Sequence, residues 1–561
     1  MNGTMLFCRP GRKGPRAAGS PGNPQALEEK PLFKILVSDP ISDMGIQQLH
    51  DAEDVAVDKK TGLTEDELAA VIGDYDALLV RSQTKVTERV IAAGKKLKVI
   101  GRAGVGVDNI DLEAATRHGV VVINAPDGNT ITTCEHTFAL MMAVARHIPQ
   151  AYKKLTAGEW DRKSFVGVEL RGKVLGIIGM GRIGTEVAKR AKAFGMDVIG
   201  CDPFLTEERA EKLGVKLGTV DDICAKADFI TLHVPLTSET RHMIGRKQFA
   251  LMKKGVRLIN CARGGLVDEA ALLEAIDEGI VAGAAFDVFE QEPPPADHPF
   301  LHHPNIIVTP HLGASTVEAQ ENVAIDVSEE VLHVLRGEPF KNAVNMPHVP
   351  ASVLKRLAPY FSLCDSMGRF LSQMAEGTVT EVNISYAGEL AEVDTMILTR
   401  HVVRGVLAHW LGADQVNVIN SLHLAKQRGL NVTMNKAVAS GKGFTNLITV
   451  SLKSNRETRT IAGTLLNGYG ARIVQIDKYP VDVAPEGHLI VVSHTDKPGI
   501  IGRLGTLLGD NGINIATMQV GRQVVGGDAI MVLTVDKQAS PDVIGQLSRL
   551  PDMVSVKTVN L

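Results

Sequence analysis

Short apolar runs alternate with amphipathic segments from residue 33 to residue 126. Four runs rich in Val, Ile and Leu predict buried strands, at 34–39, 77–82, 98–104 and 120–126. The segments between them carry apolar residues at helical spacing and end in glycine, at 63–73, 87–94 and 111–119. Because strands and helices alternate, the pattern predicts a parallel sheet flanked by helices, with ligands at the carboxyl ends of the strands.

The stretch 173–202 repeats this alternation around a glycine-rich turn. K-V-L-G-I-I-G (173–179) predicts a buried strand, and G-M-G-R-I-G (179–184) predicts a tight turn into a helix. M-D-V-I-G (196–200) predicts a second strand, which leads to Asp202. Four more apolar runs predict further strands, at 227–235, 256–263, 281–289 and 305–311. The six strands together predict a doubly wound domain.

Each glycine of the turn has its own physical role. Gly179 allows the tight turn, Gly181 lets the backbone approach a pyrophosphate, and Gly184 lets the helix pack closely on the strand. The helix N-terminus offers free N–H groups to the phosphates. Asp202 can accept hydrogen bonds from both ribose hydroxyls and would repel a 2′-phosphate. The stretch therefore predicts an NAD site that disfavours NADP, with a ligand-free strand–helix turn as the alternative.

Two further regions follow an amphipathic helix at 318–337, which we expect to pack back on the first sheet. From 488 to 561, the order β-α-β-β-α-β predicts a ferredoxin-like unit. Between 344 and 487, helices and then strands such as 446–452 predict another α/β region. This last region shows no chemical constellation.

Composition limits the classes of function. The net charge of −4 offers no basic field to nucleic acid or to an anionic membrane, and no run of 18 apolar residues predicts a membrane span. The six cysteines lack a C-x-x-C pair, which is typical of reduced thiols in the cytoplasm. Residues 1–30, rich in Pro, Gly and Arg, predict a disordered leader, since a transit peptide would need an amphipathic, Ser-rich helix.

Polar residues follow the predicted strands of the first region. Arg81 and Ser82 come after one strand and Asn124 lies at the end of another. Such residues are ordinary in loops, but arginines at strand ends suit an anionic substrate. Arg162 and Lys163 are expected to be surface charges, with a substrate phosphate in a neighbouring subunit as the alternative.

Three residue types needed for hydride transfer follow the later strands. Arg263, Glu292 and His311 come just past three strand ends, at the edge where the nicotinamide would lie. A guanidinium can hold a carboxylate by two parallel hydrogen bonds. An imidazole can accept a hydroxyl proton near neutral pH, and a carboxylate can orient and stabilise the resulting imidazolium. The set predicts NAD-dependent oxidation of a hydroxy acid, although each residue alone has an ordinary structural explanation.

Four motifs resemble those of the D-isomer-specific 2-hydroxyacid dehydrogenases: G-M-G-R-I-G, N-C-A-R-G-G-L-V-D, A-F-D-V-F-E-Q-E-P and P-H-L-G-A-S-T. The resemblance runs from Lys34 to Leu561 and implies that Arg263, Glu292 and His311 are the catalytic set. The implied NAD contacts are Val105, Gly179, Gly181, Arg182, Ile183, Gly184, Asp202, His233, Val234, Pro235, Cys261, Ala262, Arg263, Asp287, His311, Gly313 and Ala314. The implied substrate contacts are Arg81, Ser82, Val105, Gly106, Asn124, Arg162, Arg263 and His311.

The two C-terminal regions resemble the intervening and ACT domains of the long members of this family. Those members oxidise 3-phospho-D-glycerate (3-phosphoglycerate) to 3-phosphohydroxypyruvate with NAD, the first step of the phosphorylated L-serine biosynthesis pathway. The resemblance implies this function and a homotetramer. The alternatives are another D-2-hydroxyacid dehydrogenase, such as a glyoxylate or hydroxypyruvate reductase, a 2-hydroxyglutarate side activity, or an NAD-sensing corepressor.

The segment H-T-D-K-P-G-I-I (494–501) resembles the ACT loop that binds amino acids across a dimer interface. His494, Asp496 and Asn514 match the positions that bind serine in regulated relatives. The resemblance therefore implies L-serine as an effector, with Asp496 pairing with its ammonium group. An ACT fold used only for dimerisation is the alternative.

The expected fold is a Rossmann doubly wound NAD domain inserted in a flavodoxin-like substrate domain, followed by an α/β intervening domain and a ferredoxin-like ACT domain. The expected boundaries are 1–30 for the leader, 31–127 with 312–343 for the substrate domain, 128–311 for the NAD domain, 344–487 for the intervening domain and 488–561 for the ACT domain.

Overall fold

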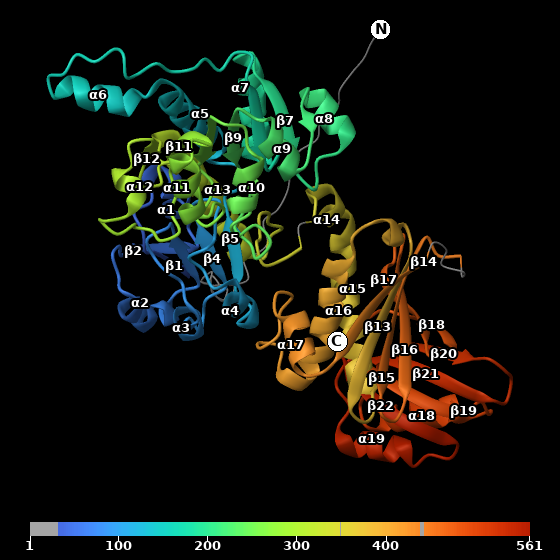
Figure 1. The fold of residues 1–561 in the computed structure, drawn as a ribbon. Coiled ribbons are helices and arrows are strands. Elements are labelled where there is room, and N and C mark those ends of the chain that lie inside the picture. Colours follow the sequence, from blue (N-terminus) through green and yellow to red (C-terminus); the bar gives the residue numbers. More distant parts are fainter. Residues whose placement is uncertain (1–31, 348, 438–442) are drawn as a thin grey trace, which may run out of the picture.

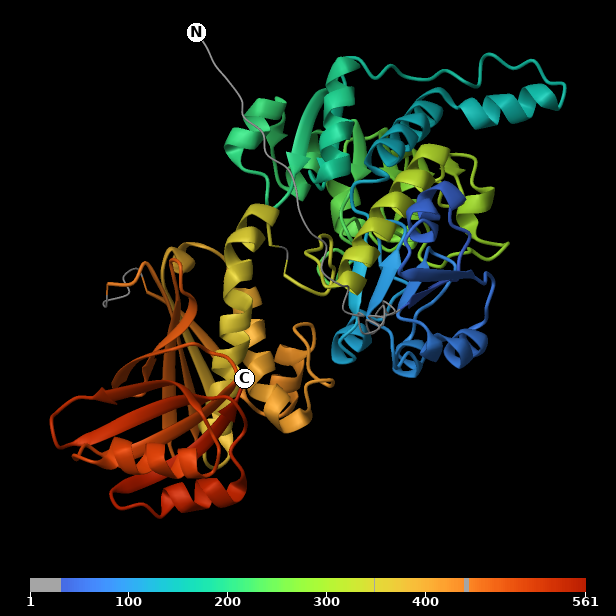
Figure 2. The ribbon, with the colours of Figure 1, turned by 180° about the vertical axis from the view of Figure 1, so that it is seen from behind.

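The computed structural model describes residues 32–347, 349–437 and 443–561, so the leader predicted at 1–30 lies outside the described residues. The strands of the described part form four sheets (Figure 1). Two sheets make up the N-terminal half, and the other two form a second body beside it (Figures 1 and 2). No helix in this part of the chain has both the length and the apolar character needed to span a bilayer.

The first sheet contains five parallel strands in the order β2-β1-β3-β4-β5. Their bounds are β1 Phe33–Val37, β2 Val55–Lys59, β3 Ala77–Val80, β4 Val99–Arg102 and β5 Val121–Asn124. This is the flavodoxin-like order, which confirms the predicted fold class. The sequence pattern does not predict β2, because this edge strand is at least partly exposed throughout and has no continuous apolar run.

Helices cover both faces of the first sheet. They are α1 Asp43–His50 and α13 Val317–Arg336 on one face, and α2 Glu65–Val71, α3 Glu88–Ala93 and α4 Leu112–Arg117 on the other. A Cβ built on Gly45 of α1 would overlap Ala324 of α13, and one on Gly101 of β4 would overlap Val327. These close approaches fix α13 on the first sheet, so the chain returns there after the second sheet.

The second sheet contains seven parallel strands in the order β12-β11-β10-β9-β6-β7-β8. Their bounds are β6 Val174–Ile178, β7 Asp197–Cys201, β8 Lys216–Leu217, β9 Phe229–Leu232, β10 Val256–Asn260, β11 Val281–Phe286 and β12 Ile306–Val308. The sheet is doubly wound as predicted, but the predicted count of six strands is wrong. The additional strand, β8, is a two-residue exposed edge strand and therefore leaves no apolar run in the sequence.

The second sheet is also covered on both faces. Helices α5 Thr130–Arg146, α7 Arg182–Ala193 and α8 Glu207–Leu213 contribute to one core, and α9 Val220–Lys226, α10 Arg246–Leu251, α11 Glu269–Asp277 and α12 Pro299–His302 contribute to the other. Helix α6 (Ile148–Thr156) buries none of its residues. Together with residues 157–164 it forms an arm that projects from the body (Figures 1 and 2), and the chain returns to α5 where the N–H of Val168 donates to the carbonyl of Ala145.

The third sheet has six strands in the order β14-β13-β15-β16-β17-β18, antiparallel except for the β13–β14 pair. The strands are β13 Val379–Gly388, β14 Asn431–Ala437, β15 Asn446–Ser454, β16 Thr458–Leu466, β17 Gly470–Ile476 and β18 Tyr479–Val483, and the helices are α14 Ala351–Leu357, α15 Phe361–Met374, α16 Met396–Leu411 and α17 Ser421–Gln427. Gly368 of α15 and Gly405 of α16 each face the backbone of the other helix, so these two helices pack closely.

The fourth sheet is antiparallel, with the order β20-β21-β19-β22. Its elements are β19 His488–Thr495, α18 Ile500–Asp510, β20 Ile515–Arg522, β21 Asp528–Val535, α19 Pro541–Ser548 and β22 Met553–Asn560, which confirms the predicted β-α-β-β-α-β unit. Leu489 and Val491 of β19 join the core around α15, while Ile490 and Val492 face α18 and α19. The third and fourth sheets therefore share one core.

The loop before α17 connects the two halves. The side-chain amide of Asn417 donates to the carbonyl of Gly119, with an N···O distance of 2.7 Å. Ile419, 3% exposed, joins the core between the first sheet and α13. This join lies next to β5 in the first sheet.

Candidate active site

The turn after β6 has the geometry that an approaching diphosphate needs. Gly179 has a φ of 96°, and a Cβ there would overlap the carbonyl of His233. A Cβ on Gly184 would overlap the carbonyl of Gly179, so both positions need glycine. A Cβ on Gly181 would meet nothing within 4 Å, which leaves open space before the N-terminus of α7. No side chain caps that N-terminus, so its N–H groups can bind a phosphate.

Asp202 follows β7 beside this turn. Its carboxylate accepts hydrogen bonds from the backbone N–H groups of Met180 and Phe204, both at 2.8 Å. These bonds fix the carboxylate at the end of β7, where a ribose would lie, and leave further lone pairs for its hydroxyls. Arg182, at the start of α7, forms an ion pair with Asp127 of the loop after β5. The residues at this turn fit NAD.

The other predicted NAD contacts lie in loops that follow neighbouring strands. They are His233, Val234 and Pro235 after β9, Cys261 and Ala262 after β10, Asp287 after β11, and Gly313 and Ala314 after β12. The strands are parallel, so these loops share one edge of the sheet with the glycine-rich turn. Burial lowers the pKa of His233 to about 4, so this ring is neutral at physiological pH.

His311 and Glu292 form a hydrogen-bonded pair at the same edge. Nδ1 of His311 lies 2.7 Å from Oε2 of Glu292, and the other carboxylate oxygen accepts the N–H of Phe289 at 3.1 Å. Partial burial raises the pKa of Glu292, but the hydrogen bond and charge of His311, the Phe289 N–H and the charge of Arg263 together hold it below its ordinary value. Glu292 is therefore ionised and can stabilise a proton on His311.

Asp287 lies beneath the loop that carries His311. Its buried carboxylate accepts hydrogen bonds from the Thr309 hydroxyl at 2.6 Å and from the N–H groups of Leu312 and Gly313 at 2.7 and 2.8 Å. Nε2 of His136 in α5 lies 3.1 Å from the same carboxylate. Asp287 therefore orients the histidine loop, in addition to its predicted position beside the cofactor.

Arg263 extends from the second sheet toward the first. Its Nε donates to Asp108 at 3.0 Å, and its Nη1 donates to the carbonyl of Ala262 at 2.7 Å. A Cβ on Gly106 would overlap Nη2 of Arg263, so the guanidinium lies directly against the loop after β4. Arg263 thus connects the loops at the ends of the two sheets, and Gly106 lies beside it.

A second arginine, Arg102 at the end of β4, is absent from the predicted site residues. Burial, together with the positive charges of Arg263 and Arg81, lowers its pKa to about 10. Its Nε donates to Asn109 at 2.8 Å, and the Asn109 amide donates to the carbonyls of Arg81 and Thr84. Arg102 therefore lies close enough to Arg263 and Arg81 for their charges to act on it. The signal for Arg102 is its place at a strand end, which it shares with Arg81.

Comparison with protein-family models assigns three parts of the chain. Residues 138–313 match the D-isomer specific 2-hydroxyacid dehydrogenase NAD binding domain. Residues 356–477 match the D-3-phosphoglycerate dehydrogenase intervening domain, and residues 488–552 match the ACT domain. D-3-phosphoglycerate dehydrogenases of Bacillus subtilis and Methanocaldococcus jannaschii are each 48% identical to the chain over 94% of its length and 100% of theirs.

The chain belongs to the D-3-phosphoglycerate dehydrogenase branch of the D-isomer specific 2-hydroxyacid dehydrogenase family. The predicted family and the NAD-binding domain are thereby confirmed. A solved Thermus thermophilus protein matches this dehydrogenase with a TM-score of 0.52 and 35% identity, covering 56% of the chain and 100% of its own. A glyoxylate reductase of Paecilomyes thermophila matches with a TM-score of 0.51 and 32% identity, covering 56% of the chain and 98% of its own.

The remaining predicted substrate contacts of the dehydrogenase lie in three different parts of the fold. Asn124, at the end of β5, donates to the carbonyl of Val105 and so supports the loop that carries Gly106. Ser82 is exposed in the loop after β3. Arg162 is exposed, in the segment that follows α6.

The predicted effector residues of the ACT domain already have partners within the chain. Asp496 accepts hydrogen bonds from Arg522 at 2.6 Å and from the N–H of Gly526, and Asn514 donates to Asp536 at 3.0 Å. His494 is 2% exposed, and its Nε2 has no hydrogen-bond partner.

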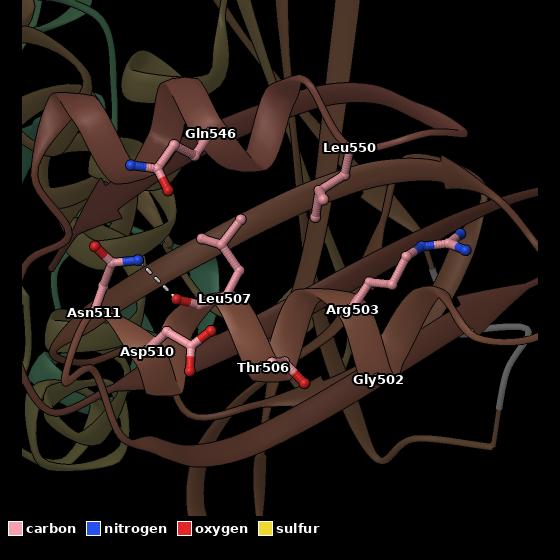
Figure 3. Close-up of a pocket in the computed structure, with 8 residues that line it drawn as sticks. All are labelled: Gly502, Arg503, Thr506, Leu507, Asp510, Asn511, Gln546 and Leu550. Carbon is pink, nitrogen blue, oxygen red and sulfur yellow. Dashed lines mark hydrogen bonds between the residues drawn. The ribbon is translucent and has the colours of Figure 1, made fainter.

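A shallow hollow of about 580 Å³ lies elsewhere on the ACT domain, between α18 and α19 (Figure 3). It is lined by Gly502, Arg503, Thr506, Leu507, Asp510, Asn511, Gln546 and Leu550. None of the three predicted effector residues lines this hollow.

Proposed function

We propose that this dehydrogenase oxidises 3-phospho-D-glycerate to 3-phosphohydroxypyruvate with NAD, as the first step of the phosphorylated L-serine pathway. The observation that carries the proposal is the His311–Glu292 pair, with 2.7 Å between Nδ1 and Oε2, close enough to Arg263 for the charge of this arginine to act on Glu292. Full-length relatives named D-3-phosphoglycerate dehydrogenase support it. Bound NAD supplies the acceptor for the hydride that leaves C2.

The proton steps follow from the geometry of the pair. Neutral His311 accepts the C2 hydroxyl proton through Nε2, because Nδ1 faces Glu292. The ionised Glu292 stabilises the imidazolium that forms. Arg263 holds the C1 carboxylate and the C2 oxygen, where negative charge develops as the proton leaves.

The phosphate is assigned to the first-sheet side of the cleft. Arg81 and Arg102 are the cations there, and Asn109 connects their loops. An acid with both a carboxylate and a phosphate carries enough negative charge to pair with three arginines. Arg162 or Lys163 of a neighbouring subunit is a further phosphate contact in this proposal.

Initial-rate assays test the proposal. NADH formation is measured with 3-phosphoglycerate, D-glycerate, glycolate and 2-hydroxyglutarate at equal concentration. We expect 3-phosphoglycerate to give the highest kcat/KM. A higher kcat/KM with an unphosphorylated acid would assign the chain to another hydroxyacid reaction, and NAD binding without turnover of any acid would favour a sensor.

The domain boundaries, compartment and assembly complete the proposal. We assign the substrate and NAD domains to 31–127 with 312–343 and to 128–311, followed by the intervening domain at 344–487 and the ACT domain at 488–561. A cytoplasmic homotetramer is proposed, with the five free cysteines of the described residues in support of a reducing compartment. L-serine is proposed as the effector at the ACT domain, and a rate unchanged by serine would leave that domain an assembly role.

A further inference from the structure

A second His–Glu pair, His298 and Glu269, is linked to the His311–Glu292 pair. Nε2 of His298 lies 3.0 Å from Oε2 of Glu269, and both side chains are largely buried. Nδ1 of His298 accepts the N–H of Phe300, so in the neutral ring the proton is on Nε2 and is donated to Glu269. The rings of Phe289 and Phe300 contact the imidazole edge-on, at 5.5 and 5.1 Å between centroids. This packing fixes the orientation of the ring.

Glu269 connects this pair to the catalytic loop. Its other carboxylate oxygen, Oε1, accepts the N–H of Glu290 at 3.1 Å. That N–H belongs to the peptide between Phe289 and Glu290, and the N–H of Phe289 donates to the carboxylate of Glu292. Glu292 in turn contacts His311. Hydrogen bonds and the backbone of Phe289, which joins the two peptide units that carry these N–H groups, therefore connect His298 to His311.

The same peptide also lies against the loop of Arg263. A Cβ on Gly264 would overlap the carbonyl carbon and oxygen of Phe289, so the Phe289–Glu290 peptide is packed directly on the residue that follows Arg263. The position of this peptide consequently affects two catalytic loops. Glu269 lies at the start of α11, whose helical backbone is a rigid support for it.

We infer that Glu269, oriented by His298, is a positioning residue for hydride transfer. It holds the Phe289–Glu290 peptide and thereby keeps Glu292 aligned with His311. The inference rests on the proposed function, since it assumes that the Glu292–His311 pair moves the substrate proton. Misalignment of a catalytic group by about 1 Å can lower a rate by about 100-fold, so the loss of a residue that aligns Glu292 should have a measurable effect on kcat.

Single variants provide the first test. Glu269→Ala is expected to lower kcat about tenfold, with the KM for NAD and the NADH affinity changed less than about twofold. Glu269→Gln, which keeps an oxygen for the Glu290 N–H, is expected to recover most of the loss. His298→Asn keeps an acceptor for Phe300, but its shorter side chain does not place an N–H where Nε2 lies beside Glu269, so a loss of about threefold is expected. Glu274→Ala, on the same helix and paired with the exposed Arg246, is the matched control.

A double-mutant cycle separates positioning from general stabilisation. In a Glu292→Ala background, Glu269→Ala should change kcat less than about twofold, because the group that it aligns is gone. An equal loss in both backgrounds, or a kcat equal to that of Glu274→Ala, overturns the inference. If Glu269→Ala does not fold, His298→Asn is carried through the same cycle. Ratios are measured on whichever hydroxy acid the wild type oxidises, so a wrong substrate assignment contradicts only the proposed function.

Discussion

The N-terminal and C-terminal halves use their sheets in opposite ways. Each N-terminal sheet is parallel and has a separate apolar core on each face, so neither face is free for the other sheet. The third and fourth sheets are mostly antiparallel and share a single core around α15. In the first arrangement the sheets meet through polar loops at their strand ends, and those loops carry the residues that we propose for catalysis.

The two interfaces therefore have different roles: the N-terminal one carries the proposed site, and the C-terminal one stabilises the fold. Arg263 reaches Gly106 and Asp108 across the N-terminal cleft, where the contacts are polar and close to solvent. Across the C-terminal interface the contacts are buried apolar side chains. Variants in the first interface should therefore change rates, while variants in the second should change stability.

Removing the histidine of the cleft should have the largest effect. His311→Ala is expected to lower kcat about 10³-fold, which is about 4 kcal/mol in the barrier, because the proton acceptor is lost. The melting temperature should stay within about 2 °C, since the side chain is about half exposed. His302→Ala, an exposed histidine nearby in sequence, is the control. A near-normal kcat for His311→Ala would refute the mechanism.

Opening the shared C-terminal core should act on stability alone. Phe370 of α15 is 1% exposed, and Phe370→Ala is expected to cost about 3 kcal/mol. Hydrogen exchange, measured at increasing denaturant concentration, should show the backbone amides of the third and fourth sheets losing protection together, while the affinity for NADH is retained. Tyr469→Ala, at an exposed aromatic residue in the same half, is the control. Loss of protection in the third sheet alone would contradict a shared core.

Cofactor choice should respond more modestly to the acid after β7. Asp202→Asn keeps an acceptor oxygen for one of the two N–H groups, of Met180 or Phe204, and removes the charge that repels a 2′-phosphate. The ratio of kcat/KM for NAD over NADP is expected to fall about tenfold, which is about 1.4 kcal/mol. Asp197→Asn, at the opposite end of the same strand, should leave the ratio unchanged. An unaltered ratio in Asp202→Asn would remove this residue from cofactor selection.

The join between the halves should give the smallest effect. Asn417→Ala removes the hydrogen bond to Gly119, together with the bonds that Oδ1 accepts from Ile419 and Asn420, and should cost about 1 kcal/mol or somewhat more. In differential scanning calorimetry, the unfolding transitions of the two halves should then lie further apart in temperature. Asn511→Ala, whose side chain bonds only within the ACT domain, is the control. Unchanged transitions would show that the Asn417 side chain does not hold the two halves together.

The sequence predicts best where local pattern and chemistry coincide. Parallel strands bring their carboxyl ends to one edge of the sheet. The sequence can therefore predict that residues at these ends lie near one another: the glycines at 179, 181 and 184, and Arg263, Glu292 and His311. The sequence does not predict strands β2 and β8, since exposed edge strands lack a continuous apolar run.

The sequence also does not predict interactions between residues that are distant along the chain. Asp496 suggests a free carboxylate for a ligand, yet it pairs with Arg522, which lies 26 residues away. The role of Arg102 depends on Asn109 and on two other arginines, and no short motif encodes that grouping. Glu269 and His298 have no visible link to Glu292 until the peptide between Phe289 and Glu290 is placed.

Gly106 has a consequence for the evolution and engineering of the enzyme. A Cβ at this position would overlap Nη2 of Arg263, so any side chain there would displace the guanidinium, which is the flexible end of that residue. The glycine therefore decides where the guanidinium can lie, without forming a bond to it. A series of side chains of increasing volume at position 106 would move the guanidinium by increasing amounts, and the rate of each variant would show how far it can move while turnover persists.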